Sequence, residues 1–485
     1  MNNNANSDDK NDTLGRLKTY ANDIATAAKI LADHLQDCGV GSSSSSSVFS
    51  TPQLAVPRDA PYEVHRARCN LLNTINRLQT LLAEPADFIQ QLASQTQLLA
   101  CLRWLGEFQV LACVPLNDSV PAKDVADLTG VPETQLRRIV RMTATAGFLH
   151  EPEPGYIAHT ALSAPFVTQL CYLDAAMFLA ETAAPAALQM AAATKLLHNE
   201  QAAGGDTTAY SLAFNTSQTF QAACEQRPKL QRQWPAFLRC AGDVDDSVPE
   251  LLGRLDWLSL GSACIVDVCA DSTSAATALA ELFPALHFVV QLGAPVVHGS
   301  ANGGAAGGGG GGGTGVGMTP PSLSEAGRPN SLSRARITVQ KRAAGSPQTV
   351  RDAAVYMVRV AAPSCSPPLL LAYVAAELRA HLAVLRANPA ATLVLAPRPL
   401  PDPGSVDPSV EAAACLRDLA KMQLLAGGRD VDVAELVDLV GGVRDGGGGL
   451  VVVNRLHARN SATVALGVKY RAGGDGQAGL KPAVL

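Results

Sequence analysis

The chain has 485 residues, of which 47% are apolar, and a formal net charge of −5 at pH 7. This length and apolar content predict a globular protein with two or three domains, and the small negative charge excludes a basic field for non-specific nucleic-acid binding. No apolar run approaches the roughly 18 residues of a membrane span, and the first residues are polar and acidic, unlike a secretory signal. We therefore expect a soluble protein of the nucleus, with the cytoplasm as a second compartment, and no membrane contact.

The eleven cysteines are scattered along the chain and form no C-x-x-C pair. The closest two, Cys264 and Cys269, flank a short apolar run. This spacing excludes a zinc cluster or zinc finger within the chain and predicts reduced thiols, most of them small core residues.

The first predicted unit comprises residues 1–61. Residues 1–13 have a composition typical of disorder. Leu14 to Cys38 place apolar side chains at helical spacing and predict an amphipathic helix, and the serines from Ser42 to Ser47 begin a flexible linker that extends to Pro61. We expect this tethered helix to dock on its own domain or on another protein.

The second predicted domain covers residues 62–170 and begins with a helix whose apolar residues share one side. The pattern from Pro85 to Val167 then predicts a winged helix, in which helix, turn, helix and hairpin follow in that order. The expected elements are a long helix over Asp87–Leu111, a short helix over Lys123–Leu128, a turn at 129–132, a helix over Glu133–Ala146 and a hairpin over Phe148–Thr160 that pivots on Pro154-Gly155.

The second helix of this module displays Arg137, Arg138 and Arg141, which raises the alternative of direct DNA reading. Five nearby acids offset these arginines, namely Asp124, Asp127, Glu133, Glu151 and Glu153. Because winged helices also serve as dimerisation domains, the pattern favours a packing or dimer role. We expect a homodimer that reaches DNA only indirectly, through a partner.

A strand–turn–helix–strand unit typical of cofactor-binding folds spans Cys264 to Leu292. The expected elements are a buried strand over Ile265–Val268 that holds Asp267, a helix over Ala275–Phe283 stopped by Pro284, and a second strand over His287–Leu292. A nucleotide-type ligand would lie at the turn after the first strand, where glycines let the backbone approach it. The turn here contains no glycine.

Further apolar elements complete an α/β domain over residues 171–475. We expect strands over Val355–Val360, Thr392–Ala396, Gly449–Val453 and Thr463–Val468, and helices over Leu369–Leu385 and Leu416–Leu425. A Gly-rich insert at 299–333 interrupts the domain. Its polyglycine matches a phosphate-binding pattern trivially, but it neither follows a strand nor opens a helix, so it predicts an inserted loop.

The chain from about Pro85 to Arg471 resembles fungal and plant small-molecule O-methyltransferases. Within that group it is most similar to the methyltransferase-like transcriptional co-activators that regulate aflatoxin and sterigmatocystin gene clusters, and related clusters such as that for dothistromin. Four long segments carry the likeness: LLACLRWLGEFQVLACVPL (98–116), VPETQLRRIVR (131–141), FLHEPEPGYIAHTALSAPFVTQ (148–169) and EQRPKLQRQ (225–233). The resemblance implies a class I methyltransferase-like (Rossmann-like) α/β domain preceded by an all-α, winged-helix dimerisation domain.

The same resemblance implies that the methyl-transfer chemistry is missing. The family's first motif places an acid before a glycine-rich turn that cradles S-adenosylmethionine. Asp267 matches the acid, whereas the glycine positions hold Cys269, Ala270, Asp271 and Thr273. Side chains at these positions would fill the ligand's space, and a non-glycine residue at positive φ costs about 1–2 kcal/mol. Leu292 stands where the ribose-binding acid belongs, and Ala362 falls at the position of the histidine that acts as catalytic base.

Other catalytic patterns are absent, since no G-x-S-x-G, H-E-x-x-H or P-loop motif occurs. His150 and His159 are expected to face each other across the wing hairpin as a structural pair, because no third metal ligand is evident. His287 and His381 are expected to be packing or surface residues. Trp104, Trp234 and Trp257 are expected to anchor the core.

Two functions remain from the sequence. The first is a catalytically inactive co-activator, without catalytic, cofactor-binding or metal-binding residues and without a cofactor, that works with a pathway-specific zinc-cluster transcription factor to switch on an aromatic-polyketide toxin cluster. The alternative is an active S-adenosylmethionine-dependent O-methyltransferase that acts on a polyketide intermediate.

Overall fold

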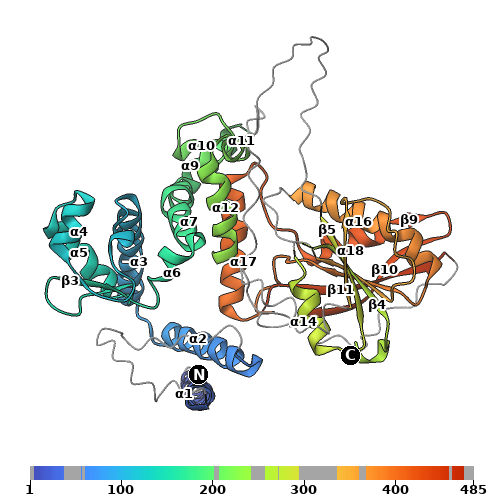
Figure 1. Ribbon diagram of the computed structural model, residues 1–485, viewed down its shortest axis with the longest axis horizontal. Helices are drawn as coiled ribbons and strands as arrows, with labels where there is room; N and C mark the ends of the chain where they lie inside the picture. The colour runs from blue at the N-terminus through green and yellow to red at the C-terminus, as the bar shows by residue number, and fades with distance from the viewer. Residues whose placement is uncertain are drawn as a thin grey trace, which may run out of the picture.

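Figure 1 shows the computed structural model, which describes residues 5–37, 56, 60–200, 207–241, 257–270, 272–293, 336–359, 367–457 and 461–473. The predicted Gly-rich insert at 299–333, Asp271 and Ala362 lie outside the described residues. The described chain forms a helical hairpin, a winged helix, a layer of helices and an α/β sheet domain.

The N-terminal hairpin consists of α1 (Ala5–Asp37) and α2 (Tyr62–Leu82). α1 begins at Ala5, earlier than the predicted start at Leu14. The two helices share a small core of Ala27, Leu31, Val64 and Ala67, so the predicted boundary at residue 61 separates two elements that pack on each other.

The winged helix follows in the predicted order. Its elements are α3 (Pro85–Glu107), the 3-10 helix η1 (Val110–Cys113), β1 (Val120–Pro121), α4 (Ala122–Thr129), α5 (Glu133–Ala144), β2 (Leu149–His150) and β3 (Tyr156–His159). β1, which the sequence did not predict, adds a third strand in the order β1-β3-β2. α5 buries Leu136, Val140 and Thr143 at helical spacing, and Gly155 makes the hairpin turn at a φ of 89°.

A layer of helices connects the winged helix to the sheet domain (Figure 1). The sequence analysis did not assign these elements, which are α6 (Pro165–Thr168), α7 (Leu170–Phe178), the π-helical turn η2 (Leu179–Ala183), α8 (Ala184–Leu188), α9 (Met190–Glu200), α10 (Ala209–Ala213), α11 (Phe220–Gln226) and α12 (Pro228–Ala241). Buried aromatic rings form their core, with Phe178 packed against Phe220, Trp234 and Phe237. The prediction that Trp234 anchors the core is confirmed, as is that for Trp257; Trp104 is partly buried against the winged-helix core.

The α/β domain is built on one eight-stranded sheet with the order β6-β5-β4-β7-β8-β11-β10-β9. Its elements are η3 (Leu258–Leu260), β4 (Cys264–Ala270), α14 (Ser274–Leu282), β5 (His287–Gly293), β6 (Ile337–Arg342), β7 (Val355–Arg359), α16 (Pro367–Ala387), β8 (Thr392–Ala396), α17 (Pro408–Leu424), α18 (Val433–Gly442), β9 (Arg444–Asp445), β10 (Gly448–His457) and β11 (Val464–Ala472). The five strands from β6 to β8 run parallel, and β11, β10 and β9 pair antiparallel. The predicted strand–helix–strand unit is confirmed as β4, α14 and β5.

The two faces of the sheet have separate apolar cores. Ile265, Phe288 and Met357 pack with α14 on one face, whereas Val266, Tyr356 and their neighbours pack with α16 and α18 on the other. Side chains alternate between these faces along each strand. This alternation decides which residue at each strand end can meet a ligand.

A polar contact joins the hairpin to the α/β domain. The Asn73 Nδ2 atom donates to Asp407 Oδ2 at 3.2 Å, and Arg77 Nη2 donates to Asp407 Oδ1 at 3.4 Å. Ser409 Oγ also donates to Asn73 Oδ1. Asp407 precedes α17 and makes no side-chain capping bond to it, so its carboxylate serves the contact with α2.

We therefore expect Asp407→Ala to loosen the hairpin. Loss of a charged acceptor of this kind is worth about 1–1.5 kcal/mol, which corresponds to roughly a five- to tenfold higher population of the detached hairpin. Limited proteolysis should show faster cleavage in α1 and α2 with an unchanged Tm of the remaining chain. Asp402→Ala, which removes only an exposed ion pair with Arg455, is the matched control; equal cleavage of both variants would contradict the assignment.

Candidate functional site

The point where the strand order reverses is the place where open α/β sheets bind ligands. In this sheet that point lies between β4 and β7, because the chain continues from β4 to β5 on one side and from β7 to β8 on the other. The carboxyl ends of these strands, together with the N-terminus of α14, form the candidate cofactor crevice. Arg359, Ala270 and Leu292 lie at or next to these strand ends.

Asp267, the acid that matches the family's first motif, is fully buried and paired with Arg359. Its Oδ1 accepts from Arg359 Nε at 3.0 Å, and its Oδ2 accepts from Arg359 Nη2 at 2.9 Å. The Arg359 side chain is 22% exposed. A bidentate, charge-assisted pair of this kind fixes both side chains in position. Asp267 therefore ties β4 to β7 at the crevice.

The described residues on either side of Asp271 do not have the backbone strain that the sequence suggested. β4 contains one extra residue relative to β5 between Asp267 and Ala270, a bulge that changes the direction of the chain before the turn. Among the described residues, non-glycine positions with positive φ occur only at Gln109 and Asn215. The expected strain of about 1–2 kcal/mol is thus wrong for Ala270 and Thr273, neither of which has a positive φ.

The N-terminus of α14 is occupied by serine side chains. Ser272 Oγ lies 2.8 Å from Ser274 Oγ and accepts from the backbone N–H of Ser274 at 3.4 Å. A helix N-terminus binds anionic groups through such free N–H donors. In this chain the Ser272 hydroxyl already uses one of them.

Leu292 lies at the end of β5, in register with Ala270 of β4. It is partly buried in the apolar cluster on the α14 face. A leucine side chain has no atom that can accept a hydrogen bond from a ribose hydroxyl. The predicted replacement therefore leaves an apolar surface on the cofactor side of this strand.

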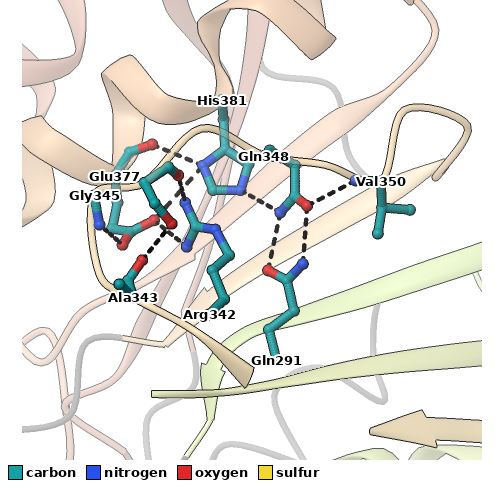
Figure 2. Close-up of polar contacts among 9 residues, drawn as sticks. Gln291, Arg342, Ala343, Gly345, Gln348, Val350, Glu377 and His381 are labelled. Carbon is teal, nitrogen blue, oxygen red and sulfur yellow. Dashed lines mark hydrogen bonds and ion pairs between the residues drawn. The ribbon is translucent and has the colours of Figure 1, made fainter. Parts of the chain in front are cut away.

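A buried polar network occupies the opposite face of the same strand ends (Figure 2). Gln291 and Gln348 exchange two side-chain hydrogen bonds of 2.9 and 3.0 Å. Gln348 Nε2 also contacts His381 Nε2 at 3.0 Å, and Arg342 Nη1 pairs with Glu377 Oε2 at 2.9 Å. These side chains join β5, β6 and α16, so the polar network holds the edge of the sheet together.

The sequence analysis did not identify this network. Glu377 and His381 are polar residues four positions apart in the mostly apolar helix over Leu369–Leu385, and that spacing was the available signal. His381, expected to be a packing or surface residue, packs fully buried. The sequence analysis also missed β6, because this edge strand has mostly exposed or half-buried side chains.

His381 is held neutral. Burial lowers its pKa to about 4, and the nearby Arg342 charge acts in the same direction. Since the Gln348 Nε2 atom can only donate, the His381 Nε2 atom accepts, and Nδ1 donates to the Glu377 carbonyl at 2.7 Å. This assigns the proton of the neutral ring to Nδ1.

The predicted pair of His150 and His159 does not form. His159 lies opposite Leu149 in the hairpin, and His150 lies opposite Ala158, so the two rings belong to different faces. His159 is buried, with Ser163 Oγ at 2.8 Å and the Leu111 carbonyl at 3.0 Å, and burial lowers its pKa. In the part of the chain that the structure describes, no group of three or more His, Cys, Asp or Glu side chains is placed to hold a metal ion. His287 is exposed on β5, as expected for a surface residue.

Two of the three arginines of α5, Arg137 and Arg141, are paired with acids. Arg137 lies 3.7 Å from Glu133 and 3.8 Å from Glu151, and Arg141 Nε lies 3.5 Å from Glu151. A Gly155 backbone bond, together with these contacts, lowers the pKa of Glu151. The predicted offset of the α5 charges by acids is thus confirmed at Glu133 and Glu151.

No described helix is long and apolar enough to cross a membrane.

The comparisons with known proteins agree with this geometry. Residues 14–83 match the family model described as the trypacidin cluster transcriptional coactivator tpcD N-terminal domain. The monodictyphenone cluster transcriptional coactivator mdpA of Emericella nidulans is 45% identical, over 95% of this chain and 99% of the relative. The dothistromin biosynthesis regulatory protein aflJ of Dothistroma septosporum is 46% identical, over 94% of this chain and 98% of the relative. The chain belongs to this family of fungal transcriptional coactivators of secondary-metabolite gene clusters.

Solved structures show the same fold with little sequence identity. OxaC matches with a TM-score of 0.52 at 17% identity, over 95% of this chain and 100% of OxaC. LepI in complex with SAM matches with a TM-score of 0.54 at 16% identity, over 83% of this chain and 94% of LepI. The coactivator therefore has an O-methyltransferase-like α/β fold behind an N-terminal helical region, as the sequence predicted.

The buried, neutral His381 predicts a pH dependence of stability. Its pKa is lower in the folded chain than the ordinary value of 6.5 in the unfolded chain, so the unfolded state binds more protons and stability decreases as the pH falls from about 6.5 to about 4. As the pH falls through this window, the wild type should lose up to about 1.4 kcal/mol of unfolding free energy per pH unit relative to His381→Leu. Urea unfolding at several pH values measures it.

The control for this experiment is His287→Leu, which changes an exposed histidine of β5. The wild-type slope should persist in that variant. A His381→Leu protein with the full wild-type pH dependence would contradict the assignment of a neutral, buried His381.

Proposed function

We propose that this coactivator is a pseudo-methyltransferase, which uses the O-methyltransferase-like fold as a scaffold and transfers no methyl group. The observation that carries the proposal is the state of the crevice between β4 and β7. The one retained acid, Asp267, is paired with Arg359, and Leu292 presents an apolar side chain at the position of the ribose acid. Ala362, at the position of the catalytic base, cannot accept a proton.

The proposed partner is a pathway-specific zinc-cluster transcription factor, and the proposed target is a fungal aromatic-polyketide toxin cluster of the kind named for the relatives. The ion pairs of Arg137 and Arg141 in α5 support indirect rather than direct DNA contact, because a phosphate would have to compete with Glu133 and Glu151 for these two side chains. The site of action that this role implies is the nucleus.

Deletion of the gene tests the coactivator against the enzyme. A coactivator predicts coordinate loss of all transcripts of one cluster, and complementation with an Asp267→Asn variant that still folds should restore them. Accumulation of one unmethylated intermediate with normal transcripts would instead identify an S-adenosylmethionine-dependent O-methyltransferase.

A homodimer is the second part of the proposal, and α3 supplies the surface. The first turns of α3 expose three large apolar side chains, Phe88 and Ile89 at 62% each and Leu92 at 51%. Leu82, at the adjoining end of α2, is 62% exposed as well. Apolar side chains gathered in this way mark interaction sites, and the winged helix to which α3 belongs supports self-association as their use.

We expect Phe88→Glu combined with Ile89→Glu to dissociate the dimer. Burial of each side chain contributes about 1.5–3 kcal/mol, so the double variant should weaken self-association by at least about 100-fold. Sedimentation equilibrium measures this change. Leu128→Glu alters an isolated leucine of α4 that is 73% exposed and should leave the assembly unchanged; a wild-type protein that is monomeric at high concentration would contradict the proposal.

A further inference from the structure

A cavity separate from the crevice lies among α9, the start of α10 and the end of α17. Its volume is about 390 Å³, and its walls include Met190, Ala193, Thr208, Met422, Gln423 and Leu425. This volume falls within the range of small-molecule sites, roughly 300–1,000 Å³. It shares no residue with the ends of β4, β5 and β7, so its use does not depend on the proposed loss of methyl transfer.

The described residues that line the cavity are uncharged. Methionine, leucine and alanine side chains supply most of it, and threonines and one glutamine supply the polar groups. An ion that entered the cavity would lose its hydration without gaining a counter-charge, which is costly. The cavity therefore selects an uncharged ligand.

The polar groups of the threonines are already engaged locally. Thr194 Oγ1 donates to the Met190 carbonyl at 3.0 Å, and Thr208 Oγ1 accepts from the Ser211 backbone N–H at 3.2 Å. The Thr208 bond caps the N-terminus of α10, and the Thr194 bond returns to the backbone of its own helix. These two threonines therefore add little free hydrogen-bonding capacity to the cavity wall.

Gln423 differs from the threonines. Its side chain is buried, with 6% of the residue exposed, and its Nε2 atom donates to the thioether sulfur of Met190 at 3.1 Å. A thioether is a weak acceptor, and within the described part of the chain the structure gives this amide no other hydrogen bond. An oxygen atom of a ligand would give the amide a stronger partner than the sulfur does.

The two methionines favour an aromatic ligand. Met190 and Met422 are unbranched and adaptable, and thioethers make favourable contacts with aromatic rings. We propose that this cavity binds an uncharged, flat aromatic molecule whose carbonyl or phenolic oxygen accepts a hydrogen bond from Gln423 Nε2. Such a site lets the coactivator respond to an oxygenated aromatic compound.

Titration calorimetry of the full chain with 1,8-dihydroxyanthraquinone tests the site. A ligand of this size with one directed hydrogen bond should bind with a dissociation constant on the order of 100 μM. The Gln423→Leu variant should bind roughly three- to tenfold more weakly. Anthraquinone-2-sulfonate carries a charge and should bind at least about tenfold more weakly than the neutral probe.

Gln135→Leu, an exposed glutamine of α5, is the control and should bind like the wild type. Ala193→Phe should abolish binding by filling the cavity, and Gln423→Leu keeps the test decisive if the larger side chain impairs folding. Absence of binding to the wild type at about 1 mM probe, or an unchanged affinity in Gln423→Leu, would overturn the proposal.

Discussion

The ion pair between Asp267 and Arg359 is the constraint around which the α/β domain is organised. It joins β4 to β7 at the point where the strand order reverses, which is where a cofactor enters this type of sheet. Removing one partner of a buried pair leaves the other charge unsatisfied and costs several kcal/mol, whereas the intact pair fixes the strands in register. Asp267 thereby has a structural role that persists without any bound ligand, and the fold can be kept when the chemistry is lost.

On both faces of the sheet, the side chains near this ion pair make their contacts within the protein. On the α14 face, Leu292 extends the apolar cluster to the strand end. On the α16 face, Gln291 belongs to the buried polar network with Gln348 and His381, which satisfies its amide internally (Figure 2). Polar groups that hydrogen-bond to one another make the packing more specific, and they do not need a ligand as a hydrogen-bond partner. A protein surface that binds partners needs such a rigid frame behind it.

The sequence predicted the parts of this fold that depend on local patterns. Apolar periodicity and glycine or proline breakers located the winged helix and the unit from β4 to β5, and the resemblance to O-methyltransferases located Asp267 and Leu292. The sequence did not reveal the features of the fold that depend on contacts between distant residues. Arg359 is 92 positions from Asp267, and the bulge in β4 arises from its pairing with β5. The prediction that His150 and His159 face each other was wrong, because the strand register places each of them opposite an apolar residue. The helices within residues 165–200 and 207–241 were missed, and their common core depends on aromatic contacts between distant positions, such as Phe178 with Phe220 and Trp234.

The central claim is that the cofactor crevice no longer binds the methyl donor. Isothermal titration calorimetry of the full chain with S-adenosylmethionine tests it most directly, with an intact thermal unfolding transition as evidence that the sample is folded. The account predicts no binding tighter than a dissociation constant of about 100 μM, or roughly −5.5 kcal/mol. A tighter dissociation constant that is abolished by changing Asp267 or Leu292 would contradict it.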